Sequence, residues 1–143
     1  PLAILGIGIY HEARRVGDDF ELTAFGPRWR FWERGDQTFA ARPGDKVHCF
    51  VSVFSPTGFV ERLSLRWVFK DPRQSWVESD SIPLGVTGGR DEGFRSVSVK
   101  GRYQPGRWRV RVETSDGREL GRIGFTVTPD EGTEPREGRV VLR

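Results

Sequence analysis

The stretch from Tyr103 to Val127 constrains the fold more than any other part of the chain. Apolar and charged residues alternate in it, and the two rows are Trp108, Val110 and Val112 against Arg107, Arg109, Arg111 and Glu113. A period of two places the two rows on opposite faces of a strand. Asp116-Gly117 then favours a tight turn, and the chain returns through Ile123, Phe125 and Val127. The stretch therefore predicts an antiparallel hairpin with one apolar and one charged face.

Most of the chain before this hairpin has a similar character, with short strand-like runs separated by turn residues. The runs cover residues 20–25, 38–42, 46–54, 62–70, 75–86 and 94–100. The chain has 18 glycines and 9 prolines, and we find no window with a clean helical stripe. Pro83 indicates that the run 75–86 is an edge strand. Together the runs predict an all-β protein, an immunoglobulin-like antiparallel β-sandwich of about seven to nine strands.

Several residues are predicted to be structural. Trp67 and Trp108 fall in the apolar rows of their strands, so we expect both in the core. Trp67 follows a strand that contains Cys49, an order similar to that of the core of immunoglobulin-like domains, although a second cysteine is missing. Cys49 is predicted to be a small buried hydrophobe. Gly106 belongs to a Pro-Gly-x-Trp motif and is also assigned a structural role.

The two ends of the chain differ from its middle. Residues 1–10 carry no charge and form an apolar lead-in, which is either the end of a membrane segment or a first strand. Because the chain opens abruptly on this run, we expect it to be a fragment of a longer protein. Residues 129–143 are rich in polar residues and are predicted to be a tail or linker. The β-sandwich domain is then expected over residues 11–128.

The motifs of common enzymes and metal sites are missing. His11-Glu12-Ala13-Arg14-Arg15 begins like a zinc motif but has Arg15 where the second histidine must stand. Gly6-Ile7-Gly8 lacks the third glycine of a dinucleotide fingerprint, and no P-loop or hydrolase elbow occurs. Paired carboxylates are harder to exclude, because a chain with 20 acidic residues offers many pairs. We expect no enzyme activity, no cofactor, no metal and no catalytic residue.

Two groups of residues are candidates for binding. Trp29, Trp32 and Trp76 lie in irregular segments and could stack on sugar rings or bases, or could cover the edges of the core. Arginines form the second group, because one sheet holding both strands would gather Arg62, Arg66, Arg107, Arg109 and Arg111 into a basic patch. Such a patch suits nucleic acid, acidic polysaccharide or anionic lipid, but it could also be an ordinary solvated face that protects the strands.

Arg95 is a separate case. Its position matches the phase of Val97 and Val99, so we expect its side chain to point inward. An inward arginine needs an acidic partner. The sequence predicts a structural ion pair, with Asp91 or Glu92 as its partner.

A family resemblance rests on three motifs. They are Gly88-Gly-Arg-Asp-Glu-Gly-Phe-Arg-Ser-Val-Ser, Pro105-Gly-Arg-Trp-Arg-Val-Arg-Val-Glu-Thr and Asp116-Gly-Arg-Glu-Leu-Gly, with Leu65-Arg66-Trp67 upstream. Over roughly Val47 to Val127 the chain resembles a bacterial domain of unknown function, the family numbered 2914. The resemblance implies no catalytic residues and no cofactor. It also implies the soluble C-terminal domain of a bacterial membrane protein.

These observations together predict a non-catalytic binding or scaffolding domain at the bacterial envelope. The resemblance places it at the inner membrane on the periplasmic side, attached through an upstream membrane segment. Its partner would be a protein or glycan of the envelope, while nucleic acid is a less favoured partner. The alternatives are a carbohydrate-binding module that uses the tryptophans, and a basic-face binder of anionic lipid or nucleic acid.

Overall fold

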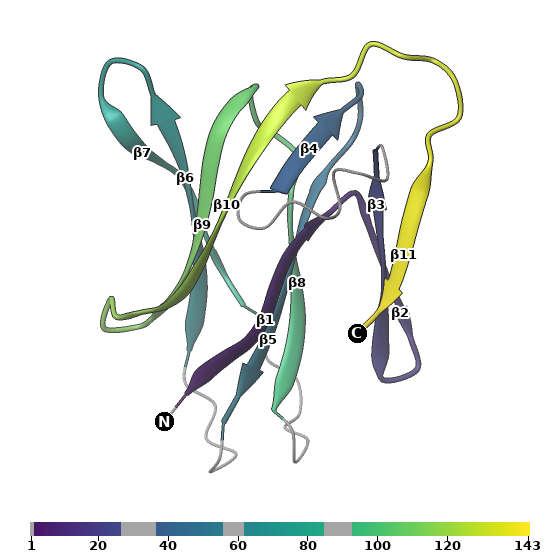
Figure 1. Cartoon of the computed structure of the whole chain (residues 1–143). Coiled ribbons are helices and arrows are strands. Elements are labelled where there is room, and N and C mark those ends of the chain that lie inside the picture. Colours follow the sequence, from purple (N-terminus) through teal and green to yellow (C-terminus); the bar gives the residue numbers. More distant parts are fainter. Residues whose placement is uncertain (1, 27–36, 56–61, 85–92) are drawn as a thin grey trace.

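The chain forms eleven β-strands in three sheets within residues 2–26, 37–55, 62–84 and 93–143, which the computed structural model describes (Figure 1). These described residues contain no helix, and so none that could span a membrane. The all-β architecture expected from the alternating runs is confirmed.

Two of the sheets form a sandwich. The smaller has three strands, in the order β1 (Ala3–Tyr10), β5 (Val47–Phe54) and β8 (Phe94–Lys100). The larger has five, in the order β4 (Gln37–Ala41), β10 (Glu119–Pro129), β9 (Gly106–Thr114), β6 (Leu63–Asp71) and β7 (Ser75–Pro83). All pairs are antiparallel except β4 with β10, which is parallel. As predicted, β7 is an edge strand.

The order of the strands identifies the type of sandwich. The chain passes from β5 to the other sheet at β6, returns from β7 to β8, and crosses again from β8 to β9. As a result β5 pairs with β8, and β6 pairs with both β7 and β9. This Greek-key exchange between two sheets is the topology of immunoglobulin-like domains. The predicted immunoglobulin-like sandwich is therefore confirmed, and its two sheets hold eight of the described strands.

The apolar rows of the strands meet between these two sheets. Leu65 and Trp67 of β6 and Val110 of β9 are fully buried, and Trp108 is 1% exposed. Cys49 on β5 is buried in the same cluster, and burial raises the pKa of its thiol. Removing this apolar surface from water is the main source of stability for such a core.

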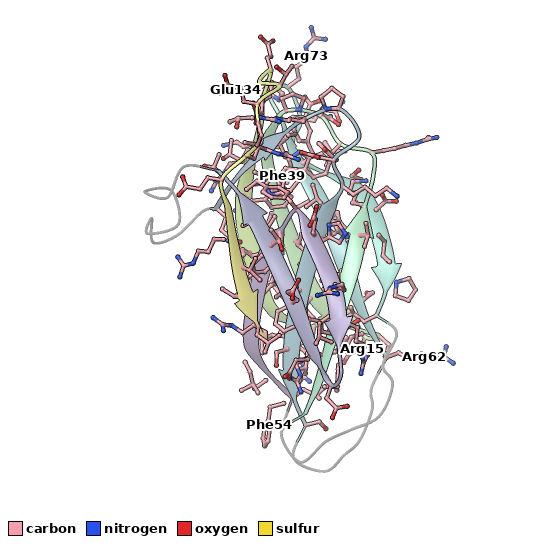
Figure 2. The ribbon with its side chains drawn as sticks, turned by 90° about the vertical axis from the view of Figure 1, so that its right-hand side faces the viewer. Arg15, Phe39, Phe54, Arg62, Arg73 and Glu134 are labelled. Atoms are coloured by element: carbon pink, nitrogen blue, oxygen red, sulfur yellow. The ribbon has the colours of Figure 1, made fainter. Side chains whose placement is uncertain are left out.

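A third sheet lies outside the sandwich. Its strands, in order, are β11 (Gly138–Leu142), β3 (Asp19–Phe25) and β2 (Glu12–Val16). Figure 1 shows it beside the sandwich sheet β1-β5-β8, and Figure 2 views the molecule from this side. The edge of Phe20 on β3 packs against Phe50 on β5, with 6.0 Å between ring centroids. Strand β5 is therefore covered on both faces, which explains why its sequence is partly apolar in both phases.

This third sheet changes our interpretation of the two ends. For the apolar run 1–10 a membrane segment and a first strand were both open, and its residues 3–10 form β1, which pairs with β5. The predicted tail 129–143 is not a simple tail, because residues 138–142 form β11 and pair with β3. The segment before β11 is held by two ion pairs, from Asp130 to Arg42 at 3.0 Å and from Arg136 to Asp45 at 2.6 Å.

His11 joins the third sheet to the sandwich. Its Nδ1 accepts a hydrogen bond from the Phe25 N–H at 3.0 Å, so Nε2 carries the proton and donates to the Ala40 carbonyl at 2.8 Å. The ring stacks on Phe39 with 3.9 Å between centroids and is 6% exposed. The neutral ring thus bridges β3 and β4.

We expect the domain to lose stability as the pH falls below about 6.5, the ordinary value for histidine. Burial lowers the pKa of His11, against the opposing effects of the Ala40 carbonyl and Asp45. The unfolded chain therefore takes up a proton at a higher pH than the folded one. The stabilising contribution is complete above about pH 6.5 and is lost as the pH falls through the lower folded value. Urea unfolding across this range measures the loss.

His11→Gln is the variant that tests this assignment, and His48→Gln is its control. His48 is half-buried, and its Nδ1 lies 3.1 Å from the carbonyl of nearby Lys46. The His11 variant should flatten the pH dependence near neutrality, whereas the control should keep it. An unchanged slope in the His11 variant would contradict the role of this ring.

Candidate functional site

Four of the arginines that the sequence singled out share one face of the five-stranded sheet, namely Arg66, Arg107, Arg109 and Arg111. Strands β6 and β9 are direct neighbours, so the condition for a basic patch is met. The register places Arg66 opposite Arg111, and Arg111 opposite Arg122 of β10. Because Trp67 and Val110 of the same strands point into the core, these arginines occupy the outer surface. Arg122 was missed from the sequence, although it shares a phase with Thr126 on the polar side of β10.

Three glutamates partly neutralise this row. Arg66 Nε lies 3.0 Å from Glu113 Oε1 and 3.5 Å from Glu78 Oε1. Glu119 contacts both other arginines, at 3.6 Å from Arg111 Nε and 2.9 Å from Arg122 Nη2. The Nε atoms of Arg66 and Arg111 are buried, and neither atom has a hydrogen-bond partner among the described residues. The row is therefore an ion-pair ladder, which holds the arginine stems in place.

Arg109 and Trp76 form the centre of the basic side. The Arg109 guanidinium carbon lies 4.0 Å from the centroid of the Trp76 ring, a close cation–π contact. Partial burial and the charges of Arg122, Arg111 and Arg107 lower the pKa of Arg109. The contributions of these three guanidinium groups to the shift show that Arg109 lies among like charges, with Glu119 opposing them. Arg109 is thus both oriented by an aromatic ring and surrounded by other cations.

We name this surface the arginine face. Its cations are Arg66, Lys70, Arg107, Arg109, Arg111 and Arg122, and its acids are Glu78, Glu113 and Glu119. Arg107 Nη1 lies 3.3 Å from the hydroxyl of Thr126. Arg62, which was predicted for the patch, is exposed just before β6 and lies at the lower end of the molecule in Figure 2. It is therefore at the margin of the face.

The tryptophans do not gather into a sugar-binding platform within the described residues. Trp76 has the Arg109 guanidinium over its ring, so that ring face is already covered. Trp29 and Trp32 lie outside the described residues. Trp67 and Trp108 lie in the core, where the sequence placed them.

Gly106 has a steric reason for its position. Its φ is 130°, which only glycine adopts readily, and an added Cβ would lie 2.9 Å from the Phe69 ring. This close approach at the start of β9 lets Phe69 pack against Trp108, with 5.0 Å between centroids.

Arg95 forms an ion pair, but not in the way the sequence suggested. Its Nη1 lies 2.9 Å from Asp19 Oδ1, whereas the expected partners Asp91 and Glu92 lie outside the described residues. Arg95 does share a face of β8 with Val97 and Val99, but the prediction that this face points inward was wrong, because Phe94 enters the sandwich core and Arg95 faces the third sheet. The side chain is 22% exposed.

The described residues offer little for catalysis by a metal. Within the described ranges, no group of three histidine, cysteine, aspartate or glutamate side chains could hold a metal ion. What the arginine face can do is bind anions, because several cations are held on one rigid sheet.

Comparison with known proteins gives one family. A model of a protein family of unknown function, DUF2914, matches residues 60–127. The resemblance to DUF2914 is confirmed. The segment of this chain that DUF2914 matches includes β6, β7, β8, β9 and most of β10, and it contains the arginine face. No curated protein matches the chain.

Two solved structures resemble the chain in shape. One is an immunoglobulin-like protein from Pseudomonas aeruginosa, 15% identical, with a TM-score of 0.48 over 90% of this chain and 97% of that chain. The other is an alkylpurine DNA glycosylase from Pseudomonas fluorescens bound to DNA, 14% identical, with a TM-score of 0.40. That likeness covers 64% of this chain and 27% of the glycosylase. Neither likeness bears on the function of this chain.

Proposed function

We propose that this chain is a non-catalytic binding module of the bacterial envelope, whose arginine face docks on anionic lipid headgroups. The observation that carries the proposal is the setting of Arg109, which is fixed on Trp76 among Arg107, Arg111 and Arg122. Preorganised cations lose little side-chain freedom when an anion arrives. A phosphate near Arg109 would also relieve the repulsion among the four guanidinium groups.

The shape of the face favours an extended ligand. The arginines stand on the outer surface of neighbouring strands β6, β9 and β10, which is a sheet surface and not a cleft. A membrane presents many phosphates at once, and each cation close to it contributes about 1 kcal/mol. In this proposal the domain works on the periplasmic side of the inner membrane, and an upstream membrane segment keeps it there. A protein or glycan partner at the envelope could bind the rest of the molecule.

Vesicle binding tests the function. The chain should bind vesicles of phosphatidylglycerol and phosphatidylcholine, and should bind pure phosphatidylcholine vesicles far more weakly. Added salt should weaken the binding, since exposed charges are screened. The double variant Arg107→Gln/Arg109→Gln should lose about 30-fold in affinity, from about 1 kcal/mol for each arginine. Sedimentation of the vesicles measures the bound fraction.

The control carries the same change of charge on the other side of the molecule. Arg14→Gln/Arg15→Gln alters β2 of the third sheet and should leave vesicle binding nearly unchanged. Equal loss in both double variants would mean that only net charge matters and would contradict a specific face. Equal binding to zwitterionic vesicles, or tighter binding to a DNA duplex at the same salt, would also overturn the proposal.

A further inference from the structure

A cavity of about 430 Å³ lies between the sandwich sheet β1-β5-β8 and the third sheet. Its floor comes from the outward face of β1 and β5, including Gly6, Phe50 and Ser52. Its polar lining includes Arg95 from β8 and Arg143, which follows β11. Strands β1 and β5, which line the cavity, belong to the other sheet of the sandwich from β6, β9 and β10, which carry the arginine face (Figure 1).

The hollow exists because β1 lacks a side chain at Gly6. A bulge between Ile4 and Gly6 shifts the register with β5, so Gly6 pairs with Ser52, another small residue. The backbone does not demand glycine there, because the φ of Gly6 is outside the left-handed region. An added Cβ would contact only the Ser52 Cβ, at 3.9 Å, an ordinary distance. The space above Gly6 is therefore open, and packing alone does not explain the glycine.

The cavity combines an apolar floor with cations from two different sheets. Phe50 is 4% exposed, and Phe20 packs against it from the third sheet. Arg95 is held by Asp19 at 2.9 Å. Arg143 is fixed by two backbone hydrogen bonds with Phe20, of 2.7 and 2.9 Å, and its Nη1 donates to the Leu142 carbonyl at 3.1 Å.

Tyr10 adds a hydroxyl to the lining, and nearby charges affect the pKa of this hydroxyl. Burial raises the pKa of Tyr10, while the charges of Arg143 and Arg139 oppose that shift. Two arginines, Arg143 and Arg139, therefore lie close enough to the Tyr10 hydroxyl to act on it from the side of β11. Asp19, the acid near this part of the lining, forms its ion pair with Arg95.

We propose that this cavity binds a small amphiphile with a carboxylate head and a short acyl chain. Arg95 and Arg143 would receive the carboxylate, since guanidinium groups form strong, directed hydrogen bonds with it. The acyl chain would lie over Phe50 and the open space at Gly6. The volume falls near the lower end of the roughly 300–1,000 Å³ of small-molecule pockets, so a short chain fits better than a phospholipid.

Calorimetry with octanoate, below the concentration at which it forms micelles, tests this site. The full chain should bind octanoate, and octanol should bind about tenfold more weakly or worse because it has no charge for the arginines. Gly6→Leu fills the hollow and should abolish binding. Arg143→Gln alters an exposed side chain and should weaken octanoate binding about tenfold while leaving the fold intact.

The control is the double variant of the arginine face, Arg107→Gln/Arg109→Gln, which should bind octanoate like the parent chain. Its result separates this cavity from vesicle binding, so either proposal can fail alone. Octanol binding as tight as octanoate, or unchanged octanoate affinity in Arg143→Gln, would overturn the assignment. If Gly6→Leu does not fold, amide shifts of Gly6 and Ser52 in the parent chain decide, because they must move when octanoate is added.

Discussion

Replacing Trp108 with alanine should lower the free energy of unfolding by about 4 kcal/mol, one of the largest effects of any single change in this chain. The side chain is 1% exposed and lies between Phe69 and Phe125, at centroid distances of 5.0 and 6.3 Å. It also receives the charge of Lys100, whose Nζ is 5.7 Å from the ring centroid. Alanine would leave a cavity that these neighbours cannot fill. Urea unfolding monitored by circular dichroism measures the loss.

A matched pair of phenylalanine variants separates packing from hydrogen bonding. Trp108 Nε1 donates to the Gln104 carbonyl at 2.9 Å, whereas Trp67 Nε1 is buried with no hydrogen-bond partner in the described part of the chain. Trp108→Phe should therefore cost about 1 kcal/mol more than Trp67→Phe. Equal costs would show that the Trp108 hydrogen bond adds nothing to stability.

Gly93→Ala should be the second severe change, with a loss of at least about 3 kcal/mol. The φ of Gly93 is 96°, and an added Cβ would lie 2.0 Å from the Val53 carbonyl oxygen. That oxygen belongs to the backbone of β5, so relief requires the two strands to separate where Phe94 pairs with Val53. We expect a fall in the midpoint of thermal unfolding that is large enough to leave little folded protein at physiological temperature.

Gly44→Ala is the control for the conformational part of this effect. Its φ is 88°, but an added Cβ would meet nothing within 4 Å. It should cost only about 1–2 kcal/mol, the penalty for a left-handed backbone. If the two glycine variants were equally destabilised, the close approach to β5 would not be what fixes Gly93.

The sequence predicted the direction of the side chains correctly where a strand has one buried and one solvent-exposed face. Strands β6 and β9 alternate over most of their length, and their inner rows, with Trp67 and Trp108, form the core as expected. The same reasoning failed for Arg95, because the buried face of β8 is the one that carries the polar side chains. Ser96, Ser98 and Lys100 are buried on one face of β8, while Val97 and Val99 share the other face with Arg95. The positions of the valines therefore led to the wrong prediction of which face of β8 is buried in the core.

The third sheet was missed because its pairing is set by contacts far apart in the chain. Strand β11 is five residues long with three exposed apolar or basic positions, and its partner β3 lies more than 100 residues earlier. For the same reason only part of the arginine face could be predicted from the sequence. The arginines on β6 and β9 follow from local alternation, but the glutamates and Trp76 that position them come into place only through the register of neighbouring strands.

The parallel pair β4–β10 also bears on how fast the molecule can fold. It joins residues 37–41 to residues 125–129, and β3–β11 joins two segments that are still farther apart. Neither pair can form before nearly the whole chain is available, whereas hairpins such as β9–β10 can close locally. Topologies dominated by such distant contacts fold in roughly milliseconds to seconds. Until β4 pairs with it, the edge of β10 can form hydrogen bonds with another chain. The domain is therefore most prone to misassembly while it is being synthesised at high local concentration.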